Sequence, residues 1–507
     1  MESRFLSPSL LPPPTKGHAM RSKPTSKTGP KNESSAAKTT SIKKSSPQIS
    51  DQYIARRVAE WRDAGVKRIK LALTDIDGVM RGKYLSLDKF ASVAKSGGAF
   101  CDCVLGWDVE DKLYDNVKFT GWHTAFPDAP FRLDLSTERR LADEGNIPFF
   151  LGEFTDVKTG GRHPLCPRSL LQRVLDRAKV LGYGAKIGFE YEFFVFDETP
   201  HTVREKGYRN LKPITPGNFG YSVLRSSTES DLFSGLMEYH DSLGCAIEGL
   251  HCETGPGVIE AALAPDEALR GADKAAVFKT FTKVYFQKRQ KMATFMAKWS
   301  LDYPGQSGHM HQSLFDLKTG EPVFHKQGGR EGMSPIMESY VAGMQKFLKP
   351  FLCLCAPTVN SYTRLVKGAW APTSATWGVE NRTTALRVIP GGPKTQRMEF
   401  RLGAADGNPY LVAAACIGAG LLGIEKKLKL GDPVIGSAYA VQDDLPDELK
   451  LPSNLRDSLR NLRASKEAVD LFGAEFVDHF ANSREWEVRE HERQITDWQL
   501  ARYFEII

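Results

Sequence analysis

The sequence lacks the features that define several large classes of protein. No apolar run approaches the roughly 20 residues that a bilayer-spanning helix needs, so we expect no membrane partner. The eight cysteines include no Cys-x-x-Cys pair, which argues against a zinc ribbon, and their scatter argues against a disulfide framework. We therefore predict small buried thiols in a reducing, cytoplasmic compartment. No Walker-type glycine-rich loop is present either, which excludes a common backbone cradle for phosphates.

The net positive charge comes from the first 50 residues, where seven Lys and two Arg face only Glu2 and Glu33. Their charge of +7 equals that of the whole chain, so residues 51–507 are neutral overall and show no bias toward nucleic acid. Residues 1–50 are rich in Ser, Thr, Pro and Lys, which predicts a disordered basic tail. The tail lacks the apolar segment of a secretory signal, while a transit peptide or a true start at Met20 remain alternatives.

Folded structure is predicted to begin at Asp51. An amphipathic helical pattern covers 51–65, and strand-like residues 68–85 follow with Asp-Gly at a turn position. Irregular, Gly- and Asp-rich sequence then continues to about 162, which predicts a small α+β domain over 51–162. A helix that ends at Gly182 opens the second domain, 163–507.

The second domain interleaves strand and helix signals. Strands are predicted at 186–196, 257–263, 309–314, 383–388 and 397–402. Helices are predicted at 265–297, 334–355 and 408–427, with a further amphipathic helix over 485–507. The fold class is therefore predicted to be α+β.

The stretch "KIGFEYEFFVF", residues 186–196, carries Glu190 and Glu192 two positions apart. Residues i and i+2 of a strand share a face, so two carboxylates would lie side by side on an otherwise apolar element. Burying them unpaired costs several kcal/mol each, which predicts a compensating cation, either Arg, Lys or a metal ion.

Other acids and histidines match this pair. Glu253, Glu260 and Glu399 occur in strand-like or turn contexts, and His309 and His311 alternate onto one face of a strand. Any one of these residues alone is more often a solvated or salt-bridged side chain. Together they are the oxygen-rich set with some imidazole that suits Mg²⁺ or Mn²⁺.

Arginines supply a complementary set of charges. Five of them lie within forty residues, and guanidinium forks suit carboxylate and phosphoryl oxygens. They are Arg364, Arg382, Arg387, Arg397 and Arg401. A nucleotide, if bound, would depend on metals and these side chains, because the glycine-rich loop is missing.

The motifs together resemble the glutamine synthetase superfamily, and in character the nearest members are γ-glutamylpolyamine and other glutamate–amine ligases. In chain order the motifs are "TDIDGVMRGK", "GFEYEFFVF", "ETGPGVIE", "GQSGHMHQSL", "NSYTRL", "ENRTTALR" and "RMEFRLGAADGNPYLVAAA". The resemblance covers residues 51–507. It implies a small β-grasp-like domain, a large catalytic domain with a curved antiparallel sheet, and a homo-oligomeric ring with active sites between subunits.

The resemblance also implies roles for individual residues. One of two Mg²⁺ or Mn²⁺ ions would be held by Glu192, Glu253 and Glu260, and the other by Glu190, His309 and Glu399. The ATP side would consist of His311, Ser313, Arg382, Arg387 and Arg397. The substrate side would consist of Arg364, Gly305, Arg401 and Trp370, with Arg364 and Arg382 acting in catalysis. In the implied reaction ATP phosphorylates the γ-carboxylate of glutamate, and ammonia or an amine then displaces phosphate to form a γ-glutamyl amide.

The chain departs from the family pattern on the acceptor side. Glutamine synthetases have a Gly-Tyr-Glu-Ala-Pro segment whose glutamate helps to deprotonate ammonium, whereas this chain reads "GAWAP" and places Trp370 there. Pro304 replaces an Asn, Val258 replaces a Gln, and Asp102 in "FCDCVLGWD" is a weak match to a second ammonium-contacting acid. An aromatic ring is no base but packs against alkyl groups or a larger amine.

Three functions therefore stay open. The first is an ATP-dependent ligase that joins glutamate to an organic amine or polyamine. The second is glutamine synthetase itself, because water or a neighbouring group can replace one base. The third is a non-enzymatic assembly protein on the same scaffold, which would be expected to lose metal ligands, yet all six are present.

Overall fold

The structure is a computed structural model that describes residues 50–507, and Ser50–Ile507 form one compact unit. The predicted basic tail, which includes Met20, lies outside the described residues except for its last residue, Ser50. In the described part of the chain, no helix is both long and apolar enough to cross a bilayer. All eight cysteines are free thiols; six are buried as predicted, whereas Cys101 is exposed and Cys103 is half-buried.

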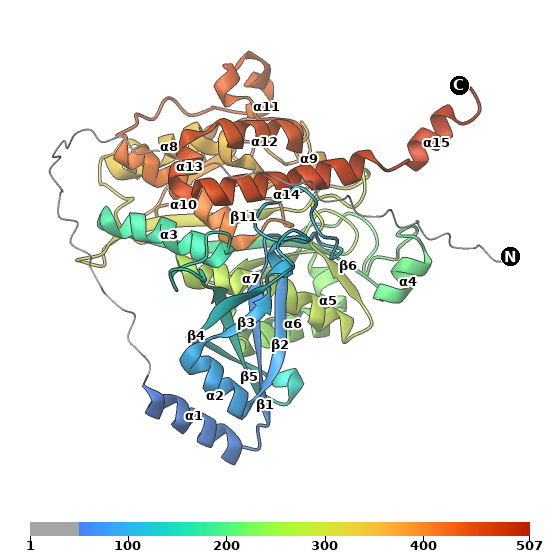
Figure 1. Cartoon of the computed structure of the whole chain (residues 1–507). Helices are drawn as coiled ribbons and strands as arrows, with labels where there is room; N and C mark the ends of the chain where they lie inside the picture. Colours follow the sequence, from blue (N-terminus) through green and yellow to red (C-terminus); the bar gives the residue numbers. More distant parts are fainter. Residues whose placement is uncertain (1–49) are drawn as a thin grey trace, which may run out of the picture. The chain divides into compact units, whose positions relative to one another are not determined.

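A five-stranded sheet forms the N-terminal part of the unit (Figure 1). Its strands follow the order β2-β1-β5-β4-β3, and β1 pairs parallel with β5. The strands are β1 Arg68–Thr74, β2 Met80–Ser86, β3 Gly98–Cys101, β4 Asp128–Leu141 and β5 Ile147–Phe154. Helices α1 (Asp51–Asp63) and α2 (Leu87–Ser96) bury Trp61 and Phe90 against Phe150 of the sheet.

The prediction of irregular sequence up to residue 162 is wrong for β4 and β5. The signal in β4 is masked because charged residues fill its exposed positions and a register shift between Asp134 and Arg139 breaks the alternation. By contrast, β5 is buried along its whole length, so its short apolar run resembles either a strand or a buried helix.

The second sheet has nine strands, and its long path runs β12-β13-β14-β11-β6-β8-β7, with β9 and β10 also pairing with β6. These strands are β6 Tyr183–Phe196, β7 Ile247–Cys252, β8 Val258–Leu263, β9 Asp266–Glu267, β10 Met292–Thr294, β11 Gly308–Asp316, β12 Trp377–Val379, β13 Leu386–Ile389 and β14 Arg397–Phe400. All five predicted strands are thus confirmed, with shifted ends. Mixed α+β structure is confirmed as well.

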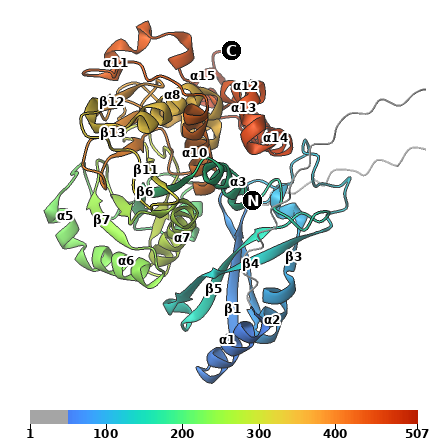
Figure 2. The same ribbon diagram turned by 90° about the vertical axis from the view of Figure 1, so that its left-hand side faces the viewer.

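Helices cover this sheet and separate it from the first one. Figure 2 shows α3 (Pro167–Val180) and α7 (Ala268–Gln287) between the two sheets, where Phe281 of α7 contacts Phe149 of β5. Helices α8 (Pro335–Cys355) and α10 (Pro409–Glu425) lie in the main core, and α10 is buried along almost its whole length. The remaining helices are α4 Pro200–Glu205, α5 Val223–Thr228, α6 Ser230–Ser242, α9 Ser361–Arg364, α11 Ala438–Val441, α12 Leu455–Ala464, α13 Lys466–Phe472, α14 Ala474–Glu492 and α15 Asp497–Tyr503.

Two predicted helices are wrong in extent. The helix predicted at 265–297 ends at Gln287, because the following "KRQK" offers no apolar face and Gln290 adopts a positive φ; β10 then begins at Met292. The helix predicted over 485–507 is two helices, since Thr496 forms a capping box with Gln499 and starts α15 anew. Figure 1 shows α15 extending away from the rest of the unit.

Candidate active site

Strand pairing brings the predicted acids and histidines together. On β11, His309 lies opposite Glu190 of β6, and His311 lies opposite Glu399 of β14. On the other side of β6, Glu192 lies opposite Glu260 of β8. Residues directly opposite in antiparallel strands have Cβ atoms about 5 Å apart on the same face, so the register alone concentrates these side chains.

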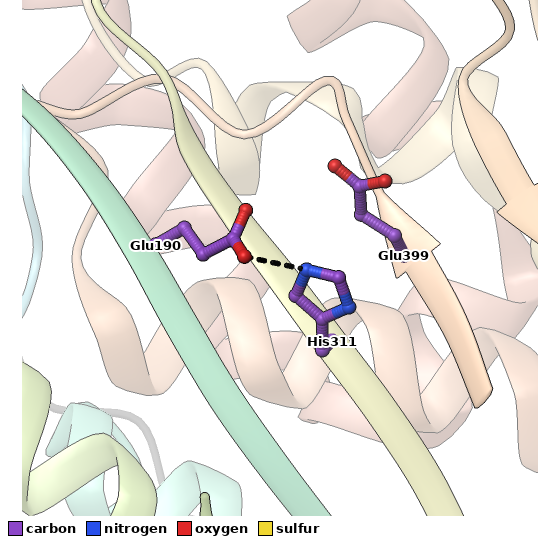
Figure 3. Close-up of side chains that lie close together, drawn as sticks. All are labelled: Glu190, His311 and Glu399. Atoms are coloured by element: carbon purple, nitrogen blue, oxygen red, sulfur yellow. Dashed lines mark ion pairs between the residues drawn. The ribbon is translucent and has the colours of Figure 1, made fainter. Parts of the chain in front are cut away.

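The first cluster contains Glu190, His311 and Glu399, whose nearest ligand atoms all lie within 4.8 Å of one another (Figure 3). His311 Nε2 lies 3.0 Å from Glu190 Oε1. His309 joins the same group, because its Nδ1 is 3.4 Å from Glu399 and 3.9 Å from Glu190. The three residues that were predicted to hold one metal ion, Glu190, His309 and Glu399, are therefore neighbours, with His311 beside them.

The second cluster contains Glu253, Glu260 and His251, again within 4.8 Å. His251 Nε2 lies 3.6 Å from Glu253 and 3.8 Å from Glu260, and its ring stacks on Tyr221 with centroids 4.3 Å apart. Glu192, the other acid predicted here, faces Glu260 across the sheet. One of its oxygens accepts a hydrogen bond from the Ser307 backbone N–H at 2.6 Å.

Sequence reasoning missed His251 and Tyr221. The stretch "HCE" places His251 two residues before Glu253, which is the spacing already used for His309 and His311. That alternation was the available signal for His251. Tyr221 follows a Gly-rich loop and carries no comparable pattern.

The two clusters differ in charge balance. Burial raises the pKa of Glu190, but contacts with His309 and His311 outweigh it and hold that pKa well below its usual range. Burial likewise raises the pKa of Glu399, and His309 and Arg401 outweigh it. In the second cluster, burial and then the charges of neighbouring glutamates raise the pKa of Glu260 to about 9. Negative charge there exceeds what the protein's own cations compensate.

The donor set fits divalent metal ions. Carboxylate oxygens with a few imidazoles are the ligands that Mg²⁺ and Mn²⁺ accept. The buried Nε2 atoms of His309 and His251 make no hydrogen bond within the described residues, although His251 Nε2 lies 3.6 Å from Glu253. Both this and the raised pKa of Glu260 are expected where a cation completes the site.

The arginines fall into two groups. Arg387 and Arg401 both pair with Glu399, and Arg387 also pairs with Glu380. Within the described residues, Arg364 has no carboxylate partner: it is buried and donates only to the carbonyls of Leu402 and Arg401. Burial lowers its pKa to about 10, so it remains charged at neutral pH.

Arg382 and Arg397 also lack a carboxylate partner within the described residues. Arg382 is exposed and lines the cavity described below. Arg397 donates from Nε to Nδ1 of His311 at 3.2 Å, which places it at the edge of the first cluster.

A cavity of about 670 Å³ joins the two clusters. Its lining includes all six residues predicted as metal ligands and the four arginines Arg364, Arg382, Arg387 and Arg401. Gly305 and Trp370 also line it; a Cβ atom on Gly305 would come within 2.6 Å of Arg364 Cγ, so glycine is required for this close approach. Trp370 lies at the surface, 66% exposed.

Four predicted residues lie outside the cavity lining. His311 borders it through Glu190, and Arg397 contacts the Nδ1 atom of His311. Ser313 lies two residues further along β11, opposite Lys186. Asp102, the weak match to an ammonium-contacting acid, is buried in the N-terminal part and accepts a hydrogen bond from Thr120 at 2.6 Å.

The chain is similar to known proteins over most of its length. The family model "Glutamine synthetase, catalytic domain" matches residues 164–503. The chain belongs to the glutamine synthetase family. Its fold is accordingly the mixed α+β fold with a curled sheet, and its relatives are ligases that use glutamate with ammonia or amines.

Curated relatives of different specificity match this family member over 87% of its length. Type-1 glutamine synthetase 2 of Dictyostelium discoideum is 46% identical, with 84% of that protein covered. Glutamate–isopropylamine ligase of a Pseudomonas species is 35% identical, with 96% covered. Gamma-glutamylethanolamide synthetase GlnA4 of Streptomyces coelicolor is 34% identical, with 93% covered.

A solved structure of GmaS in complex with ADP has the same fold, with a TM-score of 0.77 at 26% identity. The match covers 88% of this chain and 99% of the GmaS chain.

Proposed function

We propose that this glutamine synthetase-family ligase joins the γ-carboxylate of glutamate to an organic amine, with γ-glutamyl phosphate as intermediate and ATP as co-substrate. The observation that carries the proposal is a cavity lined by five carboxylates and His309, with a buried arginine that has no carboxylate partner in residues 50–507 and a neutral aromatic at the rim. These are Glu190, Glu192, Glu253, Glu260, His309, Glu399, Arg364 and Trp370.

Arg364 is proposed to bind the α-carboxylate of glutamate. Within residues 50–507 its buried guanidinium donates only to carbonyl oxygens, so a substrate carboxylate would supply the missing counter-charge in a bidentate geometry. Gly305 lets the main chain pack directly against the Arg364 side chain, where a Cβ atom would come within 2.6 Å of Arg364 Cγ.

Two divalent ions are proposed for the acidic clusters, one near Glu192, Glu253 and Glu260 and one near Glu190, His309 and Glu399. When bound, Mg²⁺ or Mn²⁺ would neutralise and polarise the phosphate oxygens of ATP and the carboxylate of glutamate. His251 borders the first of these sites and His311 the second.

Arg382, Arg387 and Arg397 are proposed to contact ATP phosphates, with His311 and Ser313 on the nucleotide side. In the first step a γ-carboxylate oxygen attacks the γ-phosphorus and ADP leaves. Arg382, which is exposed and has no carboxylate partner within the described residues, is available to follow the transferred phosphoryl group. In the second step the amine attacks the acyl carbon, phosphate leaves, and the nitrogen loses a proton.

The acceptor is proposed to be an organic amine because Trp370 replaces a carboxylate. A neutral ring neither attracts ammonium electrostatically as an acid does nor removes its proton, whereas it packs against the carbon atoms of an amine. The two amine-specific relatives support this reading. Glutamine synthetase is the second candidate, favoured by the 46% identity to Type-1 glutamine synthetase 2.

The organisation of the enzyme is also proposed from the resemblance. We place a β-grasp-like domain at 51–162 and the catalytic domain at 163–507. We further propose a homo-oligomeric ring in the cytoplasm, with active sites between subunits.

The test is phosphate release by the purified protein with ATP, Mg²⁺ and glutamate, comparing ammonium with organic amines at matched concentrations. A higher kcat/KM for an organic amine supports the proposal. A higher kcat/KM for ammonium supports the second candidate, glutamine synthetase. No phosphate release with any amine or with ammonium would refute both candidate functions.

A further inference from the structure

We infer that the preferred acceptor is a monoamine with a short uncharged tail, and that diamines and polyamines are poor acceptors. This inference rests on the proposed function and concerns the part of the amine that does not react. It follows from the distribution of charge over the walls of the cavity.

Among the described residues that line the cavity, each carboxylate belongs to the two acidic clusters. Glu190 and Glu399 contact histidines or arginines, and Glu192 accepts from a backbone N–H. All of these carboxylates are proposed metal ligands, so none is available to pair with the second ammonium group of a diamine. A second ammonium that enters without a carboxylate loses its hydration and gains no partner.

The positive charges of the cavity act in the same direction. Four arginines and five carboxylates line it, so the cavity becomes positively charged once the two proposed divalent ions are bound. A diamine bound with one nitrogen at the reacting carbon would bring its second charge into this cationic surrounding. Like charges at close range disfavour binding, and they do so most where solvent is excluded.

The remaining walls suit an alkyl or hydroxyalkyl tail. Trp370, Tyr221, Val258, Pro304 and Ala369 all line the cavity and carry no charge. A buried CH₂ group is worth about a fourfold gain in affinity on such a surface. A cation–π contact to Trp370 would favour a distal ammonium, but the ring is 66% exposed, where such contacts are weak.

Matched pairs of amines test the inference, since each pair differs only in the terminal group. We compare n-propylamine with 1,3-diaminopropane and n-butylamine with 1,4-diaminobutane, measuring kcat/KM by phosphate release with saturating ATP and glutamate. We expect kcat/KM to be about 10-fold higher for the monoamine in each pair. This factor corresponds to the cost of placing one unpaired charge at a partly solvated site. Equal or higher kcat/KM for the diamines overturns the inference while the proposed ligase activity stands. No turnover with any amine overturns both.

A pair of substitutions provides the second measurement. Trp370→Glu adds a carboxylate at the rim, and Trp370→Gln has nearly the same size without the charge. We expect the ratio of diamine to monoamine kcat/KM to be about 10-fold higher in Trp370→Glu than in Trp370→Gln. Identical ratios in the two variants would contradict the position of the amine tail beside Trp370.

Discussion

Substituting Glu260 by Gln is expected to stabilise the metal-free protein and to reduce its stabilisation by Mg²⁺. Glu260 lies in the cluster whose negative charge is least compensated, and burial together with neighbouring glutamates raises its pKa to about 9. Gln preserves the shape of the side chain and removes the charge. The variant therefore separates the electrostatic role of this residue from its packing.

The size of the effect follows from two independent estimates. Ligand atoms of Glu253 and Glu260 lie within 4.8 Å, and two unit charges at that distance repel by ~3.5 kcal/mol at an effective dielectric constant of about 20. A carboxyl whose pKa rises from 4.5 in the unfolded chain to about 9 in the folded one binds an extra proton between these values. The contribution of Glu260 to the free energy of unfolding is then fully present below pH 4.5 and is lost as the pH rises toward 9, with roughly 3–4 kcal/mol lost at neutral pH.

Chemical unfolding in EDTA at about pH 6 and about pH 8 measures this directly. We expect Glu260→Gln to be more stable than the parent at both values, with the larger gain at the higher pH. Added Mg²⁺ or Mn²⁺ should raise the parent's midpoint more than the variant's, because the variant retains only the proposed site at Glu190, His309 and Glu399 intact. Glu248→Gln, an exposed acid on β7, is the matched control and should change neither quantity. A variant that is less stable than the parent in EDTA and gains as much stability from metal as the parent does would refute the charge-excess argument.

Two further substitutions test features around the site. Asp406 Oδ2 accepts hydrogen bonds from Thr358 and Ser361, both at 2.8 Å, and so positions the short helix α9, which ends in Arg364. Asp406→Ala should therefore raise KM for glutamate about 10-fold with little change in kcat. Asp406→Asn retains an acceptor oxygen and should leave KM unchanged. Burial lowers the pKa of His479 to about 4, so the contribution of this residue to the free energy of unfolding is fully present above pH 6.5 and declines as the pH falls toward 4, by up to roughly 3 kcal/mol. Urea unfolding of His479→Gln should therefore show a flatter pH dependence between pH 6.5 and 4. An unchanged slope would contradict the assignment of this pH dependence to His479.

Period-2 alternation predicted which of the acids and histidines share a strand face. Glu190 and Glu192 on one strand, and His309 and His311 on another, share a face because of strand geometry alone. The sequence could not predict that β6 and β11 are neighbours with His309 opposite Glu190. That register depends on long-range packing, which local patterns do not encode.

The errors in the fold have the same origin. The register shift in β4 interrupts its alternation, and the long helix prediction over 265–297 crossed a charged stretch with no apolar face. In both cases the pattern changes within a segment, so a period counted over the whole segment gives the wrong boundary. The buried strand β5 was overlooked because an apolar run without alternation does not distinguish a strand from a helix.

The arginines illustrate what only three-dimensional structure provides. All five look alike in sequence, as cations spaced among strands, yet Arg387 and Arg401 are paired with Glu399 while Arg364 has only carbonyl partners within the described residues. The first two offset the charge of Glu399, the proposed metal ligand, and we expect a metal ion that takes this carboxylate to free their guanidinium groups. Arg364 needs no such exchange, because its charge is uncompensated before any ligand arrives. Binding of the acid substrate at Arg364 is therefore expected to depend less on metal concentration than binding of ATP does, and the two dissociation constants measured across a Mg²⁺ series would separate these roles.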